Sequence, residues 1–243
     1  FFWDVMPGLI TRVKKRGCLV LHQVGTADAA RQAEDAGADV LIAQGVEAGG
    51  HVHGRTSMLA LVQEIVAQSK LPVVATGGIS TGAGLVAALA FGAQGVQLGT
   101  AFLATTESFA HDYHKQRIVE ARSGDTVLTD LYVLNWPAYA AVRVIGNSVT
   151  AKLGFSTLGH DPGMLPHEVI GHEGPRPIYR YSTDSPLRIT TGDLEAMALF
   201  AGQGAGAIND IIPAGERLRR IAAEADACLR QLSLRTARLG ANR

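Results

Sequence analysis

Short apolar runs alternate with longer helical patterns along the first 120 residues of the chain. Three runs share one pattern: a helix-like stretch ends at a glycine, an apolar run follows, and a turn containing Gly or Thr closes it. They cover residues 16–26, 36–45 and 91–100. The glycine stands where a helix end favours a left-handed residue, and a continuously apolar run is typical of a strand covered on both faces. A fourth run covers residues 71–76, and residues 1–4 resemble the end of a fifth strand.

Four helix-like stretches lie between these runs, at residues 7–16, 27–36, 56–69 and 81–91. Strands that alternate with helices predict parallel βαβ units with right-handed crossovers, so the predicted fold class is α/β. Two arrangements remain open at this point, a doubly wound sheet and a closed TIM-type (β/α)8 barrel. A barrel needs eight strands, so the barrel interpretation expects only about the last five βα units here. Because the chain also starts inside an apolar run without Met, we expect an N-terminally truncated protein.

The regular alternation stops near residue 120, which divides the chain into three predicted parts. Residues 1–120 are predicted to form the C-terminal part of the barrel. Residues 121–190 contain several Pro-marked turns and are predicted to form a small irregular or helical extra domain. Residues 191–243 are predicted to form helices that pack back on the barrel.

Three helices are expected in these later parts. One lies near residues 137–145, inside the extra domain. A second begins at Thr191 or Asp193, either of which is a suitable N-cap, and ends at about Gln203. The third is a long amphipathic helix over residues 213–234, with Glu and Arg on its polar face.

Charge and composition narrow the possible partners. Lys plus Arg equals Asp plus Glu at 22 each, so the chain lacks the basic surplus that binding to nucleic acid or anionic membranes needs. No apolar stretch approaches the roughly 18 residues of a membrane span. Cys18 and Cys228 lie far apart and predict neither a disulfide framework nor a metal site, which suits a reducing compartment. We expect a cytoplasmic enzyme or binding protein with no nucleic-acid or membrane partner.

Two glycine-containing turns at predicted strand ends point to a phosphate site. The run TGGIS covers residues 76–80, and QLGT covers residues 97–100. A phosphate dianion needs converging backbone N–H groups, the close approach that Gly permits, and the partial positive charge of a helix N-terminus. Either turn alone would be explained as a tight turn. Two successive βα turns of this kind are what late barrel strands use to hold a phosphate, so together they predict such a site.

A dinucleotide-binding motif is present beside these turns but fits poorly. Residues 82–87 read GAGLVA, which matches the fingerprint G-x-G-x-x-G/A at the start of a predicted helix. That fingerprint places its first Gly directly in the turn after a strand, whereas residues 77–81 intervene here. No acidic residue ends the next strand near Leu98 either. We therefore disfavour a Rossmann-type site.

A second group of candidate residues follows the strand that ends near residue 44. Gly49 and Gly50 allow the backbone to pass close to a flat ligand, and Gln44 offers an amide at the strand end. His51 supplies a group that titrates near neutral pH. A lone His is usually an ordinary surface or core residue. Its place just beyond a strand end, where barrel enzymes assemble their sites, favours a functional role here.

Two further motifs contain residue types that are common in binding or metal sites. His167 and His172 are five residues apart, so on a helix they would point about 140° apart, and Pro166 and Gly171 favour a loop. No metal site is predicted there or elsewhere. The run AGQGAG at residues 201–206 would either pack closely against a helix or bring the backbone against a cofactor, and both interpretations remain open.

At these residues a family resemblance becomes visible. Four runs resemble the successive motifs of the nitronate monooxygenase family, formerly called 2-nitropropane dioxygenases: AQGVEAGGHVHG at 43–54, VVATGGIS at 73–80, GAQGVQLGTAF at 92–102 and ALFAGQGAG at 198–206. The similarity extends from the first residue to about Pro213. The family fold is a TIM-type barrel with a small extra domain in the late part of the chain, which agrees with the irregular segment after residue 120.

The resemblance implies that the cofactor is FMN. The phosphate end would be held by Gly77, Gly78, Gln97, Leu98, Gly99 and Thr100. The ribityl chain and isoalloxazine would lie along Gln44, Gly49 and Gly50. His51 matches the histidine of the family's AGGH motif, and the resemblance implies that it is the catalytic residue that faces the substrate pocket.

The implied reaction is the oxidation of alkyl nitronates, propionate 3-nitronate among them. Electrons pass to FMN and then to O2, and the products are a carbonyl compound and nitrite. A nitronate anion needs no proton removed, so His51 would orient it and balance its charge. For a neutral nitroalkane, His51 would act as a general base. The sequence leaves both roles open.

Two other functions remain as alternatives at this stage. An FMN-dependent enoyl-acyl-carrier-protein reductase shares the GGH and GT motifs but uses NAD(P)H. An inactive flavin-binding fragment would also carry these turns. The oligomeric state is not predicted.

Overall fold

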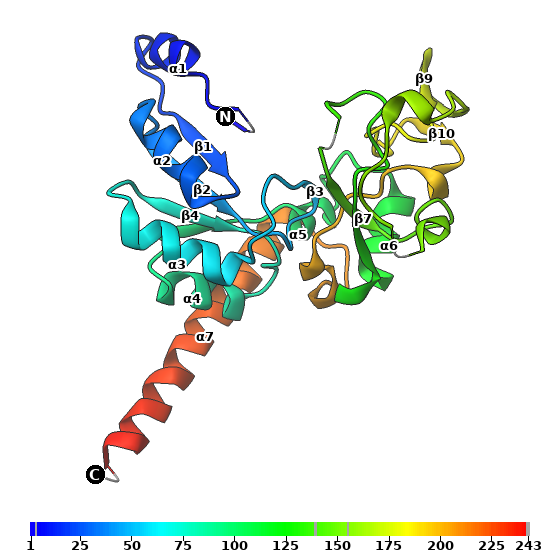
Figure 1. The fold of residues 1–243 in the computed structure, drawn as a ribbon. Helices are drawn as coiled ribbons and strands as arrows, with labels where there is room; N and C mark the ends of the chain where they lie inside the picture. Colours follow the sequence, from blue (N-terminus) through cyan, green and yellow to red (C-terminus); the bar gives the residue numbers. More distant parts are fainter. Residues whose placement is uncertain (3, 139, 155, 242–243) are drawn as a thin grey trace.

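The computed structural model describes residues 1–2, 4–138, 140–154 and 156–241, so Trp3 of the predicted first strand lies outside the described residues. The first half of the chain forms a four-stranded parallel sheet in the order β1-β2-β4-β5 (Figure 1). Its strands are β1 (Leu21–Val24), β2 (Val40–Gln44), β4 (Val73–Thr76) and β5 (Gly95–Gln97). Phe2 adds an isolated parallel bridge to Gln23, at the edge where the fifth strand is predicted.

Four helices alternate with these strands: α1 (Pro7–Lys14), α2 (Ala27–Asp35), α3 (Met58–Gln68) and α4 (Gly82–Ala90). Thr26, Ser57 and Thr81 cap the last three, each accepting a hydrogen bond from a backbone N–H of the first turn. The predicted left-handed glycines are confirmed at Gly17 and Gly92, with φ of 76° and 95°.

The core between helices and sheet is built from the continuously apolar strands. Leu41, Ala43 and Ala75 are fully buried against Leu61 and Ile65 of α3. This packing explains why the runs show no alternation of polar and apolar residues. The predicted TIM-type α/β fold is confirmed, and the described strands form an open curved sheet with β1 and β5 at its edges.

The later chain forms two small antiparallel sheets, in the orders β3-β7-β6 and β10-β8-β9. The first contains β3 (Gly50–His51), β6 (Thr126–Thr129) and β7 (Val142–Ile145). The second contains β8 (Val169–Glu173), β9 (Arg176–Tyr179) and β10 (Thr190–Gly192). Figure 1 shows this part beside the parallel sheet, with the segment that carries β3 reaching across to it.

Short helices connect these strands. The α-helices are α5 (Thr100–Leu103) and α6 (Asp112–Glu120). The 3₁₀ turns are η1 (Ser123–Asp125), η2 (Thr150–Leu153), η3 (Pro162–Met164), η4 (Leu194–Ala196) and η5 (Gln203–Ala207).

Two of the predicted late helices are wrong. The stretch 137–145 ends in strand β7, whose four residues are all buried and pair with both β3 and β6. The helix expected from Thr191 or Asp193 to Gln203 is replaced by β10 and two 3₁₀ turns, because Gly192 adopts a left-handed φ of 113° and Thr191 pairs with His172. In both cases strand pairing across the molecule overrides local helix signals.

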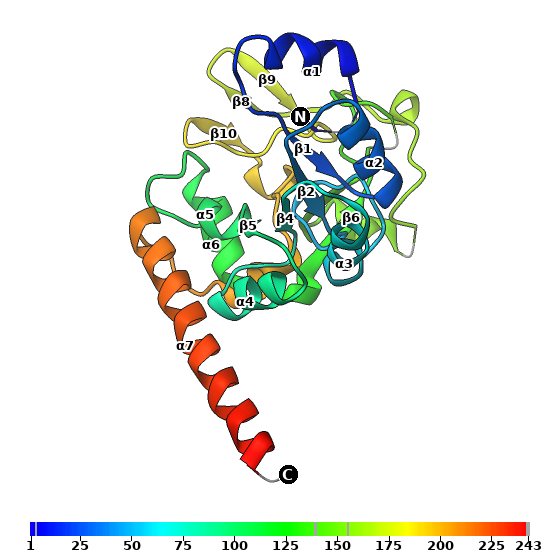
Figure 2. The ribbon, with the colours of Figure 1, turned by 90° about the vertical axis from the view of Figure 1, so that its left-hand side faces the viewer.

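The third late helix is confirmed and extends further than predicted, as α7 (Ala214–Ala241). Its first half packs on α4, and Figures 1 and 2 both show its second half projecting from the body. A Cβ added at Gly82 would lie 2.2 Å from the Ala225 nitrogen, so close helix packing explains this first Gly of the dinucleotide-like motif. No helix among the described residues has the length and apolar character needed to cross a membrane.

Candidate functional site

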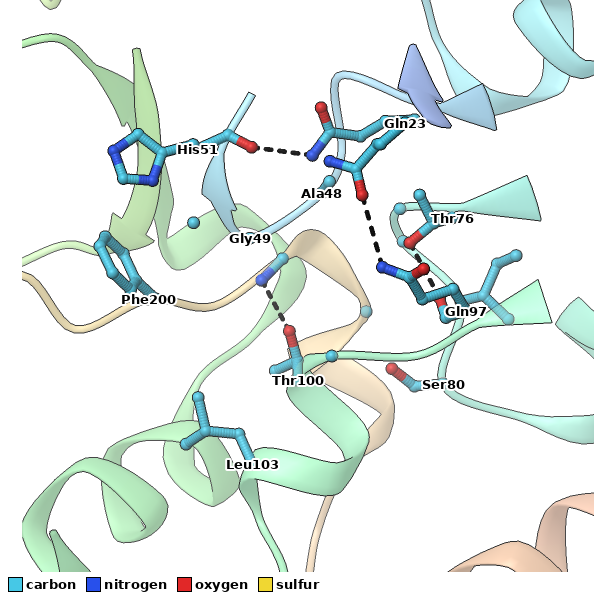
Figure 3. A pocket seen from close by; sticks show the side chains of 18 of the residues that line it. Gln23, Ala48, Gly49, His51, Thr76, Ser80, Gln97, Thr100, Leu103 and Phe200 are labelled. Atoms are coloured by element: carbon cyan, nitrogen blue, oxygen red, sulfur yellow. Dashed lines mark hydrogen bonds between the residues drawn. The ribbon is translucent and has the colours of Figure 1, made fainter. Parts of the chain in front are cut away.

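A cavity of about 370 Å³ opens at the carboxyl ends of the parallel strands (Figure 3). These ends contribute Gln23 from β1, Gln44 from β2, Thr76 from β4 and Gln97 from β5. This is the edge at which βα folds assemble their binding sites. The predicted site residues that line the cavity are Gln44, Gly49, Gly50, His51, Gly77, Gly78, Gln97, Gly99 and Thr100.

Leu98 is the predicted site residue that does not line the cavity. Its side chain packs against two hydrophobic clusters, one under the parallel sheet and one under α5. Gln97 and Gly99, the sequence neighbours of Leu98, line the cavity, whereas the Leu98 side chain points into the core.

The turn after β4 is shaped by two consecutive left-handed glycines. Gly77 has φ of 107° and Gly78 has φ of 71°. A Cβ at Gly77 would lie 3.0 Å from the Gly45 carbonyl oxygen, so both conformation and space demand glycine there. Beyond them, the Ser80 hydroxyl is buried and has no hydrogen-bond partner among the described residues. Ser80 also lines the cavity, so this turn presents an unsatisfied donor at its wall.

The turn after β5 leaves open space instead. A Cβ added at Gly99 would meet no atom within 4 Å, and its φ of −95° is accessible to any residue. The Thr100 hydroxyl accepts a hydrogen bond from the Gly202 nitrogen at 2.9 Å, which holds the 201–206 segment against this turn. A bound molecule can therefore occupy the space beside Gly99.

Side chains tie the strand ends to one another. The Thr76 hydroxyl donates to the Gln97 carbonyl oxygen at 2.8 Å, and the Gln97 side-chain amide donates to the Gln23 side-chain oxygen at 3.4 Å. Figure 3 shows these residues on the same side of the cavity as Ser80. Gln23 was missed by the sequence analysis, although it is a polar residue at the end of an apolar run, the signal that identified Gln44.

Gln44 positions the loop that carries His51. Its amide nitrogen donates to the His51 carbonyl oxygen at 2.8 Å, and its side-chain oxygen accepts from the His53 backbone nitrogen at 3.1 Å. The residue is 3% exposed. The amide predicted to meet the flavin is thus engaged mainly with the protein backbone, and its clearest role is to fix the course of residues 51–53.

Glycine is needed at positions 49 and 50 for different structural reasons. A Cβ at Gly49 would lie 2.4 Å from the Gly202 nitrogen, so the two backbones are in direct contact. Gly50 needs its left-handed φ of 71° to enter β3. The close backbone approach predicted for this pair is real, and at Gly49 it is made to the 201–206 segment. Gly202 and Gly204 of that segment line the cavity, in a 3₁₀ turn and not at the end of a helix.

His51 is held on β3, which pairs with β7 so that His51 lies opposite Val142. Within the described part of the chain, three aromatic rings lie near its imidazole, with centroid distances of 4.1 Å to Trp136, 5.9 Å to Phe200 and 6.3 Å to Phe2. Its Nε2 is buried without a hydrogen-bond partner among the described residues. Burial in this environment lowers the pKa of His51 to about 4, so the imidazole is neutral at physiological pH.

Phe200 and Trp136, the residues that pack around His51, were not identified by the sequence analysis. Phe200 is positioned by His114, a fully buried residue of α6 whose Nε2 lies 3.0 Å from the Phe200 carbonyl oxygen. Trp136 comes from the irregular segment, and neither aromatic residue carries a local signal of its role. His167 and His172 lie on or next to β8, and the described residues contain no group of three or more His, Cys, Asp or Glu arranged to hold a metal ion.

Comparison with known proteins gives consistent matches. The family model described as nitronate monooxygenase matches residues 4–224. The nitronate monooxygenase of Paraburkholderia phytofirmans is 32% identical over 232 residues, covering 92% of this chain and 59% of its own length. FabK from Thermotoga maritima superposes with a TM-score of 0.75 at 31% identity, over 96% of this chain and 69% of that structure.

A second solved structure, a nitroalkane oxidase from Streptomyces ansochromogenes, superposes with a TM-score of 0.74 at 33% identity. It covers 95% of this chain, and this chain covers 63% of it. The chain spans about half the length of the curated relatives it matches.

Proposed function

The chain belongs to the nitronate monooxygenase family of flavin-dependent oxidoreductases, and from that premise we propose that its cavity binds FMN and an alkyl nitronate. The reaction is oxidation of the nitronate, propionate 3-nitronate being one example, with O2 to a carbonyl compound and nitrite. One observation carries the proposal: the two glycine turns and the GGH segment, separate in sequence, line a single cavity at the strand ends. The similarity to a nitroalkane oxidase structure supports the same substrate class.

The turn side of the cavity fits the phosphate of FMN. Ser80 offers a buried hydroxyl that lacks a partner within the described chain, and a phosphate oxygen is a strong acceptor for it. The backbone beside Gly78 and Gly99 can approach a phosphate closely, because neither residue carries a side chain and Gly99 faces open space. Gly49, Gly50 and Gln97 then line the part of the cavity left for the ribityl chain and ring.

His51 supplies a neutral imidazole to the substrate side. A nitronate arrives as an anion, so His51 has no proton to remove and can donate a hydrogen bond to a nitro oxygen. The pKa of about 4 supports this orienting role, because a base so weak is poorly matched to proton abstraction from a nitroalkane at neutral pH. When bound, FMN would supply the redox chemistry, with the nitronate as electron donor and O2 as the final acceptor. The rings of Phe200 and Trp136 pack beside the imidazole.

A second candidate function is an FMN-dependent reductase that takes electrons from NAD(P)H. The superposition on FabK, at a TM-score of 0.75, is the observation that supports this second candidate. The two functions share the cavity and the turns but differ in the electron donor.

Anaerobic flavin reduction separates the two candidates. FMN-loaded protein would be mixed under nitrogen with propionate 3-nitronate or with NADH, and the flavin absorption band followed. The proposal expects rapid bleaching by the nitronate, no bleaching by NADH within the same time, and nitrite release when air is admitted. Bleaching by NADH alone would establish the reductase instead. Protein that binds FMN and is reduced by neither compound would leave a flavin-binding protein without this activity and refute the proposed reaction.

A further inference from the structure

Among the described residues, the ring nearest to His51 comes from the irregular part of the chain. The indole of Trp136 lies with its centroid 4.1 Å from that of the imidazole, and the two planes are inclined by 36°. Within the described chain, His51 lines the cavity whereas Trp136 does not. The indole thus lies against the imidazole without lining the cavity, and Trp136 itself remains 39% exposed to solvent.

The loop that carries Trp136 is fastened at the ring residue itself and directly before it. The Trp136 backbone nitrogen donates to the Val133 carbonyl oxygen at 3.2 Å. The side-chain oxygen of Asn135 accepts from the Thr183 backbone nitrogen at 2.7 Å and from the Thr183 hydroxyl at 3.0 Å. The Asn135 amide also donates to Asp184 at 3.3 Å. An exposed loop with this many anchors holds its aromatic side chain in a defined place.

The charged groups on the described elements around His51 are hydrogen-bonded to partners other than its imidazole. On β7, the Arg143 guanidinium donates to the Val46 carbonyl oxygen and to Thr126. The Glu47 carboxylate accepts from the Met58 nitrogen, and the terminal amino group of Phe1 donates to the Leu21 carbonyl oxygen.

Further titratable groups on the described neighbours of His51 are His114, His53 and Asp184. His114, behind Phe200, is itself neutral because burial lowers its pKa to about 4. His53 follows two residues after His51, and Asp184 bonds to Asn135 on the loop of Trp136. The pKa of His51 is lowered by burial alone. Whatever keeps water from its ring therefore controls its charge.

We propose that Trp136 is a positioning residue for the chemistry of this site: its indole seals the outer face of the His51 imidazole and so keeps it neutral and ready to donate a hydrogen bond to an anionic substrate. The inference deepens the proposed function and rests on it for the role of His51. The seal is argued from the contact between the two rings and does not depend on the proposed reaction.

Two opposite effects of an indole on a neighbouring imidazole decide the test. Excluding water disfavours the charged imidazolium and lowers its pKa. An indole face also attracts a cation, which at a partly exposed site would raise the pKa by about half a unit. Trp136→Leu keeps a bulky apolar cover without the π face, whereas Trp136→Ala removes the cover. The pair of variants therefore separates the two effects.

The experiment is an NMR titration of the His51 imidazole in the full chain, with and without FMN. His51→Asn assigns the resonance, and Phe109→Ala, which removes a half-exposed aromatic ring elsewhere, serves as the matched control. We expect Trp136→Ala to raise the pKa of His51 by about one unit and Trp136→Leu to change it by less than half a unit. The Phe109 variant should leave it at the wild-type value.

Contrary outcomes are equally clear. An unchanged or lowered pKa in Trp136→Ala, or a fall of half a unit or more in Trp136→Leu, would overturn the proposal, because the indole would then not be a seal. The pH profile of kcat/KM for a nitronate provides the second reading, and its acidic limb should move upward by the same amount in Trp136→Ala. The NMR titration needs no turnover. If the pKa shifts as expected but the protein does not oxidise nitronates, the proposed function is refuted while the effect of Trp136 on His51 stands. Thermal unfolding of each variant checks that the chain is folded.

Discussion

The two sides of the cavity are built in different ways. The turn side, with Ser80, Gln97 and Gly99, comes from contiguous motifs at neighbouring ends of one parallel sheet. The histidine side brings His51 together with Trp136 and Phe200, which lie far apart in the chain. Figure 3 shows His51 and Phe200 opposite Ser80 and Gln97. The turn side is open and polar, with unused space at Gly99, whereas on the histidine side aromatic rings pack around a buried imidazole nitrogen.

This difference means that substitutions on the two sides should fail for different reasons. On the packed side, an added atom meets protein backbone, so the fold suffers first. At Gly99 on the open side, an added atom meets no protein atom within 4 Å, so binding of a ligand should suffer while the fold is kept. The predictions below test that contrast, beginning with the largest effect.

Gly49→Ala should be the most damaging small change. Its Cβ would lie 2.4 Å from the Gly202 nitrogen, and backbone on both sides leaves little room for relaxation. We expect the free energy of unfolding to fall by about 3 kcal/mol, measured by urea denaturation. Gly95→Ala is the matched control, because a Cβ there meets nothing within 4 Å. Equal stability of the two variants would show that the contact between residues 49 and 202 is not tight.

His51→Asn should spare the fold and impair chemistry. If His51 acts as a base, kcat/KM for a neutral nitroalkane should fall by about 10²-fold while nitronate oxidation persists. If it orients the anion, as its low pKa supports, both substrates should suffer and the nitronate should lose mainly in KM. Steady-state kinetics at a pH where the two forms interconvert slowly distinguish these outcomes. Wild-type kinetics in a folded, flavin-loaded variant would remove His51 from the site.

Acid should destabilise the packed side through His114. Burial lowers its pKa from 6.5 to about 4 in the folded chain. Above pH 6.5 the neutral form predominates in both states. As the pH falls from 6.5 to 4, the unfolded chain takes up a proton that the folded chain refuses, so stability is lost. This loss amounts to roughly 2 kcal/mol by pH 4.5. His114→Gln should shrink the difference in unfolding free energy between pH 7 and 4.5 by that amount, and an identical pH dependence would contradict the assignment.

Gln97→Ala, on the open side, should have the smallest effect on the fold. Its amide makes one long hydrogen bond, 3.4 Å to Gln23, and the side chain is exposed. We expect the unfolding free energy to change by less than about 0.5 kcal/mol and FMN affinity to fall several-fold, measured by flavin fluorescence titration. A large loss of stability would mean that the open side is also part of the structural core.

The same contrast explains what the sequence could predict. The strands, the first helices and the glycine turns depend on local apolar runs and on left-handed glycines such as Gly77, so the pattern was sufficient. Strand β7 and the turn after β10 form only because distant strands pair with them, and their local signals pointed to helices. Trp136 and Phe200 were missed for a similar reason, since their roles exist only once residues 131–145 and 198–202 fold around His51. Leu98 shows the limit of a motif, which marks a backbone position without showing where the side chain points.

FMN retention by Gly99→Asp tests the central claim, that the two glycine turns hold the phosphate of FMN, more directly than any other measurement. The new side chain has open space within the protein, so the fold should be unchanged, while its bulk and negative charge would occupy and repel the phosphate. We predict wild-type thermal stability without cofactor, with flavin stoichiometry after gel filtration falling sharply for Gly99→Asp and far less for Gly99→Ala. Full flavin occupancy in a folded Gly99→Asp protein would contradict the account and place the phosphate elsewhere.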